Sequence, residues 1–391
     1  MLLAQINRSL DLKQLVDEGF EIEVNGGHLI VHHIPYVNSS REIKYGTLIT
    51  SLSLNNDVTI KPDTHVMGFM GEHPCNKDGS IISAIHHSSP NQKVVDGYVM
   101  NHTFSNKPPN GYDNYYHKVT RYAEIISAPA KSLDKTVTAQ TFKVLECSED
   151  ESMFLYTDSN SSRANISQLN EKFKGQRIGI IGLGGTGSYV LDLIAKTPVD
   201  EILLFDGDEF LQHNAFRSPG AASVETLNKR LKKVDYYTSI YSQMRRGIKT
   251  FPEKITDFNI GLLEGLSYVF VCIDSNSARG MIISKLREFG VTFIDVGLGV
   301  NVADENLVGT LRVTVGTPGK HDHILNRIGT AETDDNDYAT NIQIADLNAL
   351  NALMAIVKWK KLCGFYQDLK KEHNSTFTIN TGQLIHEDYA A

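Results

Sequence analysis

The stretch that decides the fold runs from Arg177 to Arg217 and reads RIGIIGLGGTGSYVLDLIAKTPVDEILLFDGDEFLQHNAFR. An apolar run at 178–181 leads into a glycine-rich segment at 182–187, and apolar residues at helical spacing follow it. A second apolar run, 202–205, ends at the acid Asp206. The pattern predicts a strand, a glycine turn, a helix and a second strand. In that arrangement a helix N-terminus binds phosphates, and the acid at the next strand end binds a ribose.

Strands and helices continue to alternate after this stretch. Apolar runs at 268–273 and 292–296 predict two more strands, with a helix at 278–289 between them. Helical spacing predicts one long helix over 224–244 and another over 344–364. Because alternating strands and helices build parallel sheets covered on both faces, the expected fold class is α/β, with a doubly wound, mostly parallel sheet.

The residues before this region are expected to form a domain of their own. Residues 1–150 carry strand-like runs, a hairpin pattern and short helices, which predicts an α+β domain. Five small polar residues at 158–162 indicate a linker, placed at 151–164. Residues 165–391 then form the nucleotide-binding domain.

Composition excludes several classes of protein. The chain has 391 residues, 41% of them hydrophobic and 21% charged, which is ordinary for a soluble globular protein. Its net charge of −8 gives no support for nucleic-acid binding. No apolar run approaches the roughly 18 residues of a membrane span, and charges stand where a signal peptide keeps an apolar core, so we expect a cytoplasmic protein. The four cysteines form no CxxC pair, which argues against a structural zinc site.

Charged and polar side chains gather at the predicted strand ends. Asp206 is followed by Asp208, then by Asn214 and Arg217 within one loop, and Asp274 ends the third strand. The carboxyl ends of parallel strands share one edge of a sheet, so we expect these side chains to lie together. Basic side chains neutralise phosphate oxygens, and a carboxylate holds the metal that bridges them. The sequence therefore favours an ATP site with Mg²⁺, in which a carboxylate attacks and pyrophosphate leaves.

Two other functions remain open at this point. The glycine pattern with Asp206 also fits an NAD(P)-dependent oxidoreductase. Such an enzyme has little use for the second acid, for Arg217 or for the acid at 274. The third hypothesis is a non-catalytic scaffold that retains the nucleotide fold for partner binding.

The chain resembles the ThiF/MoeB/HesA superfamily of E1-like enzymes over about residues 163–385. The resemblance rests on the order and spacing of Gly182, Gly184, Gly185, Gly187, Asp206, Asp208, Asn214, Arg217, a lysine in the next helix and Asp274. It implies a Rossmann-like E1 adenylation fold. It also implies ATP- and Mg²⁺-dependent adenylation of the C-terminal carboxylate of a ubiquitin-like protein or peptide by a homodimer.

The resemblance also assigns a role to each matching residue. The four glycines cradle ATP, Asp206 binds its ribose, and Asp208 belongs to the same nucleotide site. Asn214, Arg217 and a helix lysine contact the phosphates, and Asp274 binds Mg²⁺. We prefer Lys233 to Lys232, because Val234 follows it as in the family's pattern. Arg163 resembles the arginine that these enzymes reach across a dimer interface.

The chain departs from E1 enzymes where they carry a catalytic cysteine, because residues 307–341 contain none. Cys75 stands instead in the loop GEHPCNKDG of the first domain, which faintly resembles the His-Pro-Asn segment of E2 conjugating enzymes. We therefore treat Cys75 as a candidate thiol, with a buried turn cysteine as the alternative. The first domain is accordingly interpreted as E2-like or substrate-recognising, and an E2-like protein as a candidate partner.

The two-domain arrangement also resembles bacterial ThiF-family proteins that accompany ubiquitin-like proteins and isopeptidases in mobile or defence gene clusters. That resemblance implies a role in a bacterial ubiquitin-like conjugation or antiviral defence system. No nucleic-acid or membrane partner is expected.

Overall fold

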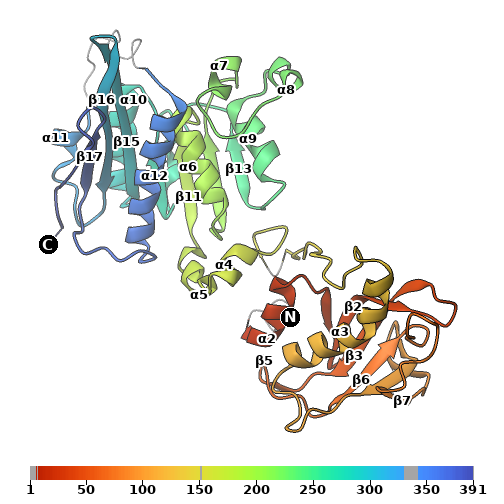
Figure 1. The fold of residues 1–391 in the computed structure, drawn as a ribbon. Coiled ribbons are helices and arrows are strands. Elements are labelled where there is room, and N and C mark those ends of the chain that lie inside the picture. Colours follow the sequence, from red (N-terminus) through yellow and green to blue (C-terminus); the bar gives the residue numbers. More distant parts are fainter. Residues whose placement is uncertain (1–5, 7, 150–151, 330–341, 391) are drawn as a thin grey trace. The chain divides into compact units, whose positions relative to one another are not determined.

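The computed structural model describes all residues except 1–5, 7, 150–151, 330–341 and 391. The chain divides into two compact units (Figure 1). The first comprises Met1–Glu146 and Thr157–Ala164, and the second comprises Cys147–Tyr156 and Asn165–Ala391.

Within its described residues, the first unit carries a six-stranded antiparallel sheet in the order β1-β2-β3-β6-β10-β7. Its strands are β1 Ile22–Asn25, β2 His28–Val37, β3 Ile43–Ser51, β6 Val66–Met70, β7 His86–Ser88 and β10 His102–Ser105. Two small hairpins join β4 Leu54–Asn55 to β5 Val58–Thr59, and β8 Gln92–Val95 to β9 Tyr98–Met100. The helices are α2 Leu10–Asp17, α3 Tyr115–Leu133 and α4 Ser159–Arg163.

A buried lysine lies between α3 and this sheet. Lys118 has no exposed surface, and its Nζ donates hydrogen bonds to Thr50 Oγ1 at 2.7 Å and to the Thr64 carbonyl at 2.8 Å. Burial in this apolar layer lowers the pKa of Lys118 to about 8. The side chain therefore makes the stability of this unit depend on pH.

We expect the stability contribution of Lys118 to rise with pH between about 8 and its ordinary pKa of 10.5. In that window the unfolded chain binds the proton and the folded chain does not, so raising the pH favours the folded state, by at most roughly 3 kcal/mol. Urea unfolding of the full chain at several pH values measures the rise. The rise should be smaller in Lys118→Met and unchanged in Lys131→Met, which removes an exposed lysine of α3. Identical pH profiles for wild type and Lys118→Met would contradict the prediction.

Among its described residues, the second unit carries an eight-stranded sheet in the order β13-β12-β11-β14-β15-β16-β17-β18. The first five strands of that order are parallel, and the last four, β15 included, pair antiparallel. The strands are β11 Arg177–Ile181, β12 Glu201–Phe205, β13 Ile248–Phe251, β14 Tyr268–Val271, β15 Thr292–Ala303, β16 Asn306–Gly316, β17 Asn374–Thr378 and β18 Gln383–Glu387. This mostly parallel, Rossmann-like α/β sheet confirms the predicted fold class.

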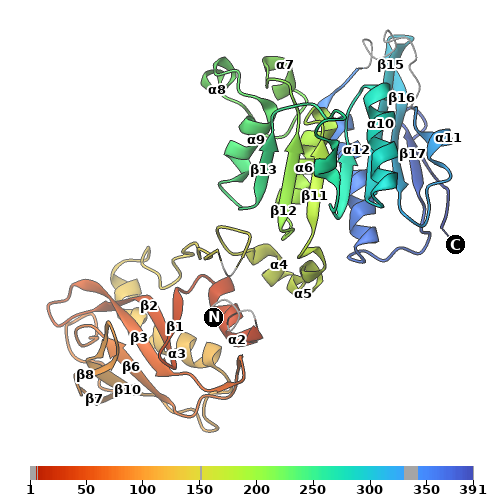
Figure 2. The ribbon, with the colours of Figure 1, turned by 180° about the vertical axis from the view of Figure 1, so that it is seen from behind.

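Helices cover both faces of this sheet. Apolar residues of α6, α9 and α12 pack on one face (Figure 1), and those of α10 pack on the other (Figure 2). The helices are α5 Ser167–Asn170, η1 Glu171–Phe173, α6 Gly185–Ala195, α7 Gln212–Ala215, α8 Val224–Asn228, α9 Lys233–Tyr241, η2 Ile260–Leu263, α10 Asn276–Glu288, α11 Ile324–Arg327 and α12 Ala345–Leu362. None of the described helices combines the length and apolar character needed to cross a lipid bilayer.

The structure corrects the prediction of one helix over 224–244. Two short helices, α8 and α9, stand there, and Arg230 between them has a φ of +47°. The break arises because this segment pairs with the chain that follows β12. Phe210 N–H donates to the Leu231 carbonyl at 2.8 Å, and Lys233 N–H donates to the Asp208 carbonyl at 2.9 Å. Tertiary pairing here overrides helical periodicity.

The segment between the two units is also more ordered than its composition suggested. Asp158 caps α4 by accepting a hydrogen bond from Ser161 N–H at 3.0 Å. Within the second unit, Arg246 donates hydrogen bonds to the carbonyls of Ser152, Phe154 and Cys147 at 2.9–3.0 Å. Thr157–Ala164 thus belongs to the first unit, and Cys147–Tyr156 belongs to the second.

Candidate functional site

The glycine loop joins β11 to α6 in a turn that only glycine fits. Gly182 has a φ of +87°, a conformation that side chains disfavour. A Cβ atom added at Gly187 would lie 1.9 Å from the Gly182 carbonyl oxygen. At Gly184, the N-cap of α6, an added Cβ would meet no atom within 4 Å. The loop is therefore tight on its inner side and open where the helix N-terminus can receive an anion.

Asp206 ties the end of β12 to this loop. Its side chain is 7% exposed, and it accepts hydrogen bonds from Leu183 N–H at 2.6 Å and from Asp208 N–H at 2.9 Å. Lys233 Nζ lies 3.5 Å from Asp206 Oδ2 and 2.9 Å from Asp208 Oδ2. The hydrogen bond from Lys233 lowers the pKa of Asp208 and keeps it ionised.

Arg217 brings a guanidinium group to the same region. Its Nε is buried and has no hydrogen-bond partner among the described residues. Asn214 is 3% exposed, accepts a hydrogen bond from Leu211 N–H at 2.9 Å and so holds the start of α7. The Asn214 carbonyl accepts from Arg217 N–H at 3.1 Å. Asn214 thus supports the turn that carries Arg217.

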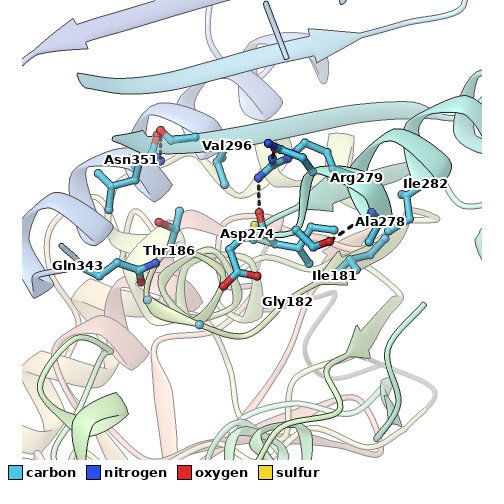
Figure 3. Close-up of a pocket in the computed structure, with 18 of the residues that line it drawn as sticks. Ile181, Gly182, Thr186, Asp274, Ala278, Arg279, Ile282, Val296, Gln343 and Asn351 are labelled. Carbon is cyan, nitrogen blue, oxygen red and sulfur yellow. Dashed lines mark hydrogen bonds between the residues drawn. The ribbon is translucent and has the colours of Figure 1, made fainter. Parts of the chain in front are cut away.

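Most of these groups line one cavity of about 610 Å³, the size of a typical ligand site. Asp274, just beyond β14, lies beside the glycine loop, with Arg279 of α10 nearby (Figure 3). The predicted residues that line the cavity are Gly182, Gly184, Gly185, Asp206, Asp208, Arg217, Lys233 and Asp274. Gly187 and Asn214 are not part of the lining and shape it from behind.

Two family models match this chain. Residues 160–381 match the ThiF family, and residues 10–159 match a domain of unknown function, DUF6791. This chain belongs to the ThiF family. The predicted resemblance is thereby confirmed over more than half of the sequence.

Several known proteins are similar in sequence to part of this ThiF chain. Ubiquitin-like modifier-activating enzyme 5 of Culex quinquefasciatus is 23% identical over 158 residues, 37% of this chain and 39% of that protein. The protein of the same name from Gallus gallus is 26% identical over 171 residues, 39% of this chain and 43% of that protein. The chain thus spans about two fifths of the length of these curated relatives.

Two solved structures resemble the ThiF chain more distantly. E. coli MccB with AMPCPP and SeMet MccA has a TM-score of 0.48 at 16% identity, covering 60% of this chain and 72% of that chain. PaaA has a TM-score of 0.46 at 16% identity, covering 75% of this chain and 94% of that chain.

Two predicted residues belong to the first unit, and neither is among the residues that line this cavity. Cys75 is 1% exposed, and its Sγ donates to the His73 carbonyl at 3.2 Å. Burial, together with Asp78 and Glu72, raises the pKa of the Cys75 thiol, which disfavours the thiolate needed for attack. Arg163 of α4 donates to the Asp17 carbonyl at 2.5 Å.

The other thiols of the ThiF chain are no more reactive in this structure. Cys272 lines the cavity, and burial raises the pKa of its thiol well above the ordinary range. Burial also raises the pKa of Cys363, and Cys147 is buried. These environments suit packing rather than nucleophilic catalysis.

Sequence reasoning missed many residues of the lining, among them Arg279, Arg312 and Asn351. These three come from α10, β16 and α12, elements that lie far from the glycine loop in sequence. An arginine within the alternating pattern of β16 is the one signal in the sequence that could have marked Arg312. The pairing that brings it to the cavity is long-range.

Proposed function

We propose that this ThiF chain adenylates the C-terminal carboxylate of a ubiquitin-like protein or peptide, using ATP and releasing pyrophosphate. The proposal rests on the cavity that brings together an open helix N-terminus, the acid Asp206, Asp274 and Arg217, whose Nε has no hydrogen-bond partner among the described residues. Each of these groups suits one part of a metal-bound nucleoside triphosphate. The names of the curated relatives, ubiquitin-like modifier-activating enzymes, support the choice of a ubiquitin-like protein or peptide as the substrate that is adenylated.

Different groups on the cavity would bind different parts of ATP. Backbone N–H groups at the start of α6 bind phosphate oxygens. Asp206 retains lone pairs beyond its two backbone hydrogen bonds, and they accept the ribose hydroxyl. Arg217 donates to the phosphates, and Lys233 shifts from its two aspartates toward them. Asn214 acts indirectly, because it stabilises the turn that carries Arg217.

The donor set on the cavity also suits Mg²⁺. Within the described part of the chain, no group of three or more His, Cys, Asp or Glu side chains is arranged to hold a metal ion. Mg²⁺ characteristically binds through one or two carboxylates together with substrate phosphates, and Asp274 supplies such a carboxylate. When bound, Mg²⁺ would neutralise charge on the phosphates.

The reaction needs positioning and charge stabilisation more than proton transfer. A carboxylate oxygen of the substrate attacks the α-phosphorus, the bond to the bridging α,β-oxygen breaks, and pyrophosphate leaves with that electron pair. The attacking carboxylate is already ionised, so no general base is required. Arg217 and the α6 N–H groups stabilise the charge that develops on the phosphates.

We extend the proposal to the setting of the reaction. A cytoplasmic homodimer, in which Arg163 serves the neighbouring subunit, would act in a bacterial ubiquitin-like conjugation or antiviral defence system. The first unit would recognise the substrate or an E2-like partner. The support for this setting is the resemblance described above and the ThiF family match.

ATP–pyrophosphate exchange is the test of the proposed reaction. We expect exchange with Mg²⁺ and ubiquitin-like proteins or peptides that end in a free carboxylate. The same peptides carrying a C-terminal amide should give none, because the amide cannot attack the α-phosphorus. Tight NAD(P) binding without ATP binding would instead support an oxidoreductase. ATP binding without exchange by any carboxylate would support a scaffold.

A further inference from the structure

A second cationic group stands on the cavity beyond the residues assigned to the nucleotide. Arg312 of β16 donates to Asp295 Oδ2 at 2.6 Å and to Thr314 Oγ1 at 2.5 Å. Arg279 Nε lies 3.0 Å from Asp295 Oδ1, in an ion pair whose N–H is not aligned for a hydrogen bond. Both arginines line the cavity, and Asp295 lies behind them, fully buried.

The charges of this group do not balance. Among the ion pairs of the described residues, one carboxylate, Asp295, pairs with both guanidinium groups, which leaves a surplus of one positive charge. The Arg279 side chain is 5% exposed and that of Arg312 is 19% exposed, so water screens the surplus poorly. An unbalanced buried charge is unfavourable unless an anion completes it. Arg312 lines the cavity, so an anion that completes this group belongs there.

The sheet places Arg312 away from the phosphate site. It pairs with Gly297 on β15, and a Cβ there would lie 2.9 Å from the Arg312 guanidinium, so this glycine makes room for it. β16 is two strands from β14, the strand that leads to Asp274. At about 4.8 Å per strand, the Arg312 backbone lies about 10 Å along the sheet from that strand, and its guanidinium reaches back to Asp295 of β15. An anion at Arg312 would thus lie on the β15–β16 side of the cavity, whereas the glycine loop follows β11.

A neighbouring side chain points to a ligand that contains an amide. Asn351 of α12 is fully buried, and its Nδ2 donates to the Gly297 carbonyl at 3.1 Å. That contact fixes which amide atom is oxygen, because a carbonyl can only accept. Asn351 Oδ1 is buried without a hydrogen-bond partner among the described residues, and the residue lines the cavity. A backbone N–H of a bound peptide would satisfy it.

We propose that Arg312 binds the attacking C-terminal carboxylate, while Asn351 accepts a backbone N–H of the same polypeptide. Asp295 and Arg279 are positioning residues that hold the Arg312 guanidinium. The inference rests on the proposed adenylation and names the residues that select its acyl substrate. Arg312 leaves one carboxylate oxygen free to form the bond to the α-phosphorus, and it transfers no proton.

Two probes separate the acyl part of the site from the nucleotide part. AMP occupies the nucleotide part alone. The stable analogue 5′-O-[N-(acetylglycyl)sulfamoyl]adenosine adds an acyl carbonyl and one peptide N–H. Calorimetric titration of the full chain should show tighter binding of the analogue than of AMP. Arg312→Gln should weaken the analogue about tenfold or more and AMP less than about twofold, since a charged hydrogen bond is lost on the acyl side alone.

Variants and controls make each outcome decisive. Arg312→Lys keeps the positive charge but lacks the planar, forked guanidinium, so it should give an intermediate loss of affinity for the analogue. It replaces Arg312→Gln if that variant unfolds at a markedly lower temperature than wild type. Arg287→Gln, at the exposed end of α10, should change neither affinity. Equal losses for both probes, or no loss for either, would overturn the role of Arg312. Equal affinity of wild type for both probes would also contradict the role of Arg312, but it would not contradict adenylation. Failure of wild type to bind AMP and ATP would instead contradict the proposed function itself.

Discussion

Replacing Asp274 by Asn is expected to abolish most of the adenylation activity while the protein stays folded. The substitution keeps the size of the side chain and removes the carboxylate proposed to hold Mg²⁺ on the cavity. We expect pyrophosphate exchange to fall by more than about a hundredfold, the usual scale for losing one electrostatic contact to the reacting phosphate. The affinity for ATP should fall mainly in the presence of Mg²⁺.

Titration of ATP with Mg²⁺ and with EDTA, for wild type and Asp274→Asn, separates the two effects. The variant should bind ATP in EDTA as wild type does and lose most of the gain that Mg²⁺ gives. Asp257→Asn, an exposed carboxylate between β13 and η2, serves as the control. Wild-type exchange in Asp274→Asn would show that another group holds the metal, even if the reaction is the one proposed.

Replacing Gly187 by Ala is expected to damage the whole nucleotide site. The added Cβ would lie 1.9 Å from the Gly182 carbonyl oxygen, a backbone atom that can yield only if the loop moves. We expect overpacking to lower stability by about 1–3 kcal/mol, and displacement of the α6 N-terminus to weaken ATP binding by at least about tenfold.

Differential scanning calorimetry and ATP titration measure the two effects of Gly187→Ala. Gly261→Ala is the matched control, because its Cβ would meet no atom within 4 Å and it lies in the short helix η2. That control should leave ATP binding unchanged. Unaltered ATP affinity in Gly187→Ala would mean that the loop tolerates a shift of its backbone, and that its tight turn is not required for binding.

Local pattern was enough to mark the residues that the structure brings together around the cavity. The glycine loop and Asp206 follow one another within a short stretch, and parallel strands bring their ends to one edge. Gly187 and Asn214 show the limit of that reasoning: spacing marks them as part of the site, but they are not among the residues that line the cavity and contact its surroundings instead. Spacing identifies which residues belong together, and packing decides which of them face the cavity.

Long-range pairing decided what the sequence could not show. Arg312 reaches the cavity through the antiparallel register of β15 and β16, which pairs it with Gly297. Asn351 reaches it because α12 packs back onto the sheet. The break between α8 and α9 has the same origin, since the intervening backbone hydrogen-bonds to the segment after β12. In each case the decisive partner lies many residues away, beyond the reach of periodicity.

The buried thiols have a consequence for the fate of the product. The pKa values of Cys75, Cys272 and Cys363 are all raised, which disfavours the thiolate form that would take an acyl group at these three positions. A mixed anhydride left in the cavity then has two fates: water destroys it, or an acceptor from another polypeptide collects it. The lifetime of the adenylate would set the time allowed for that handover. If the chain carries out the proposed adenylation, slow release of the adenylate would thus favour that handover.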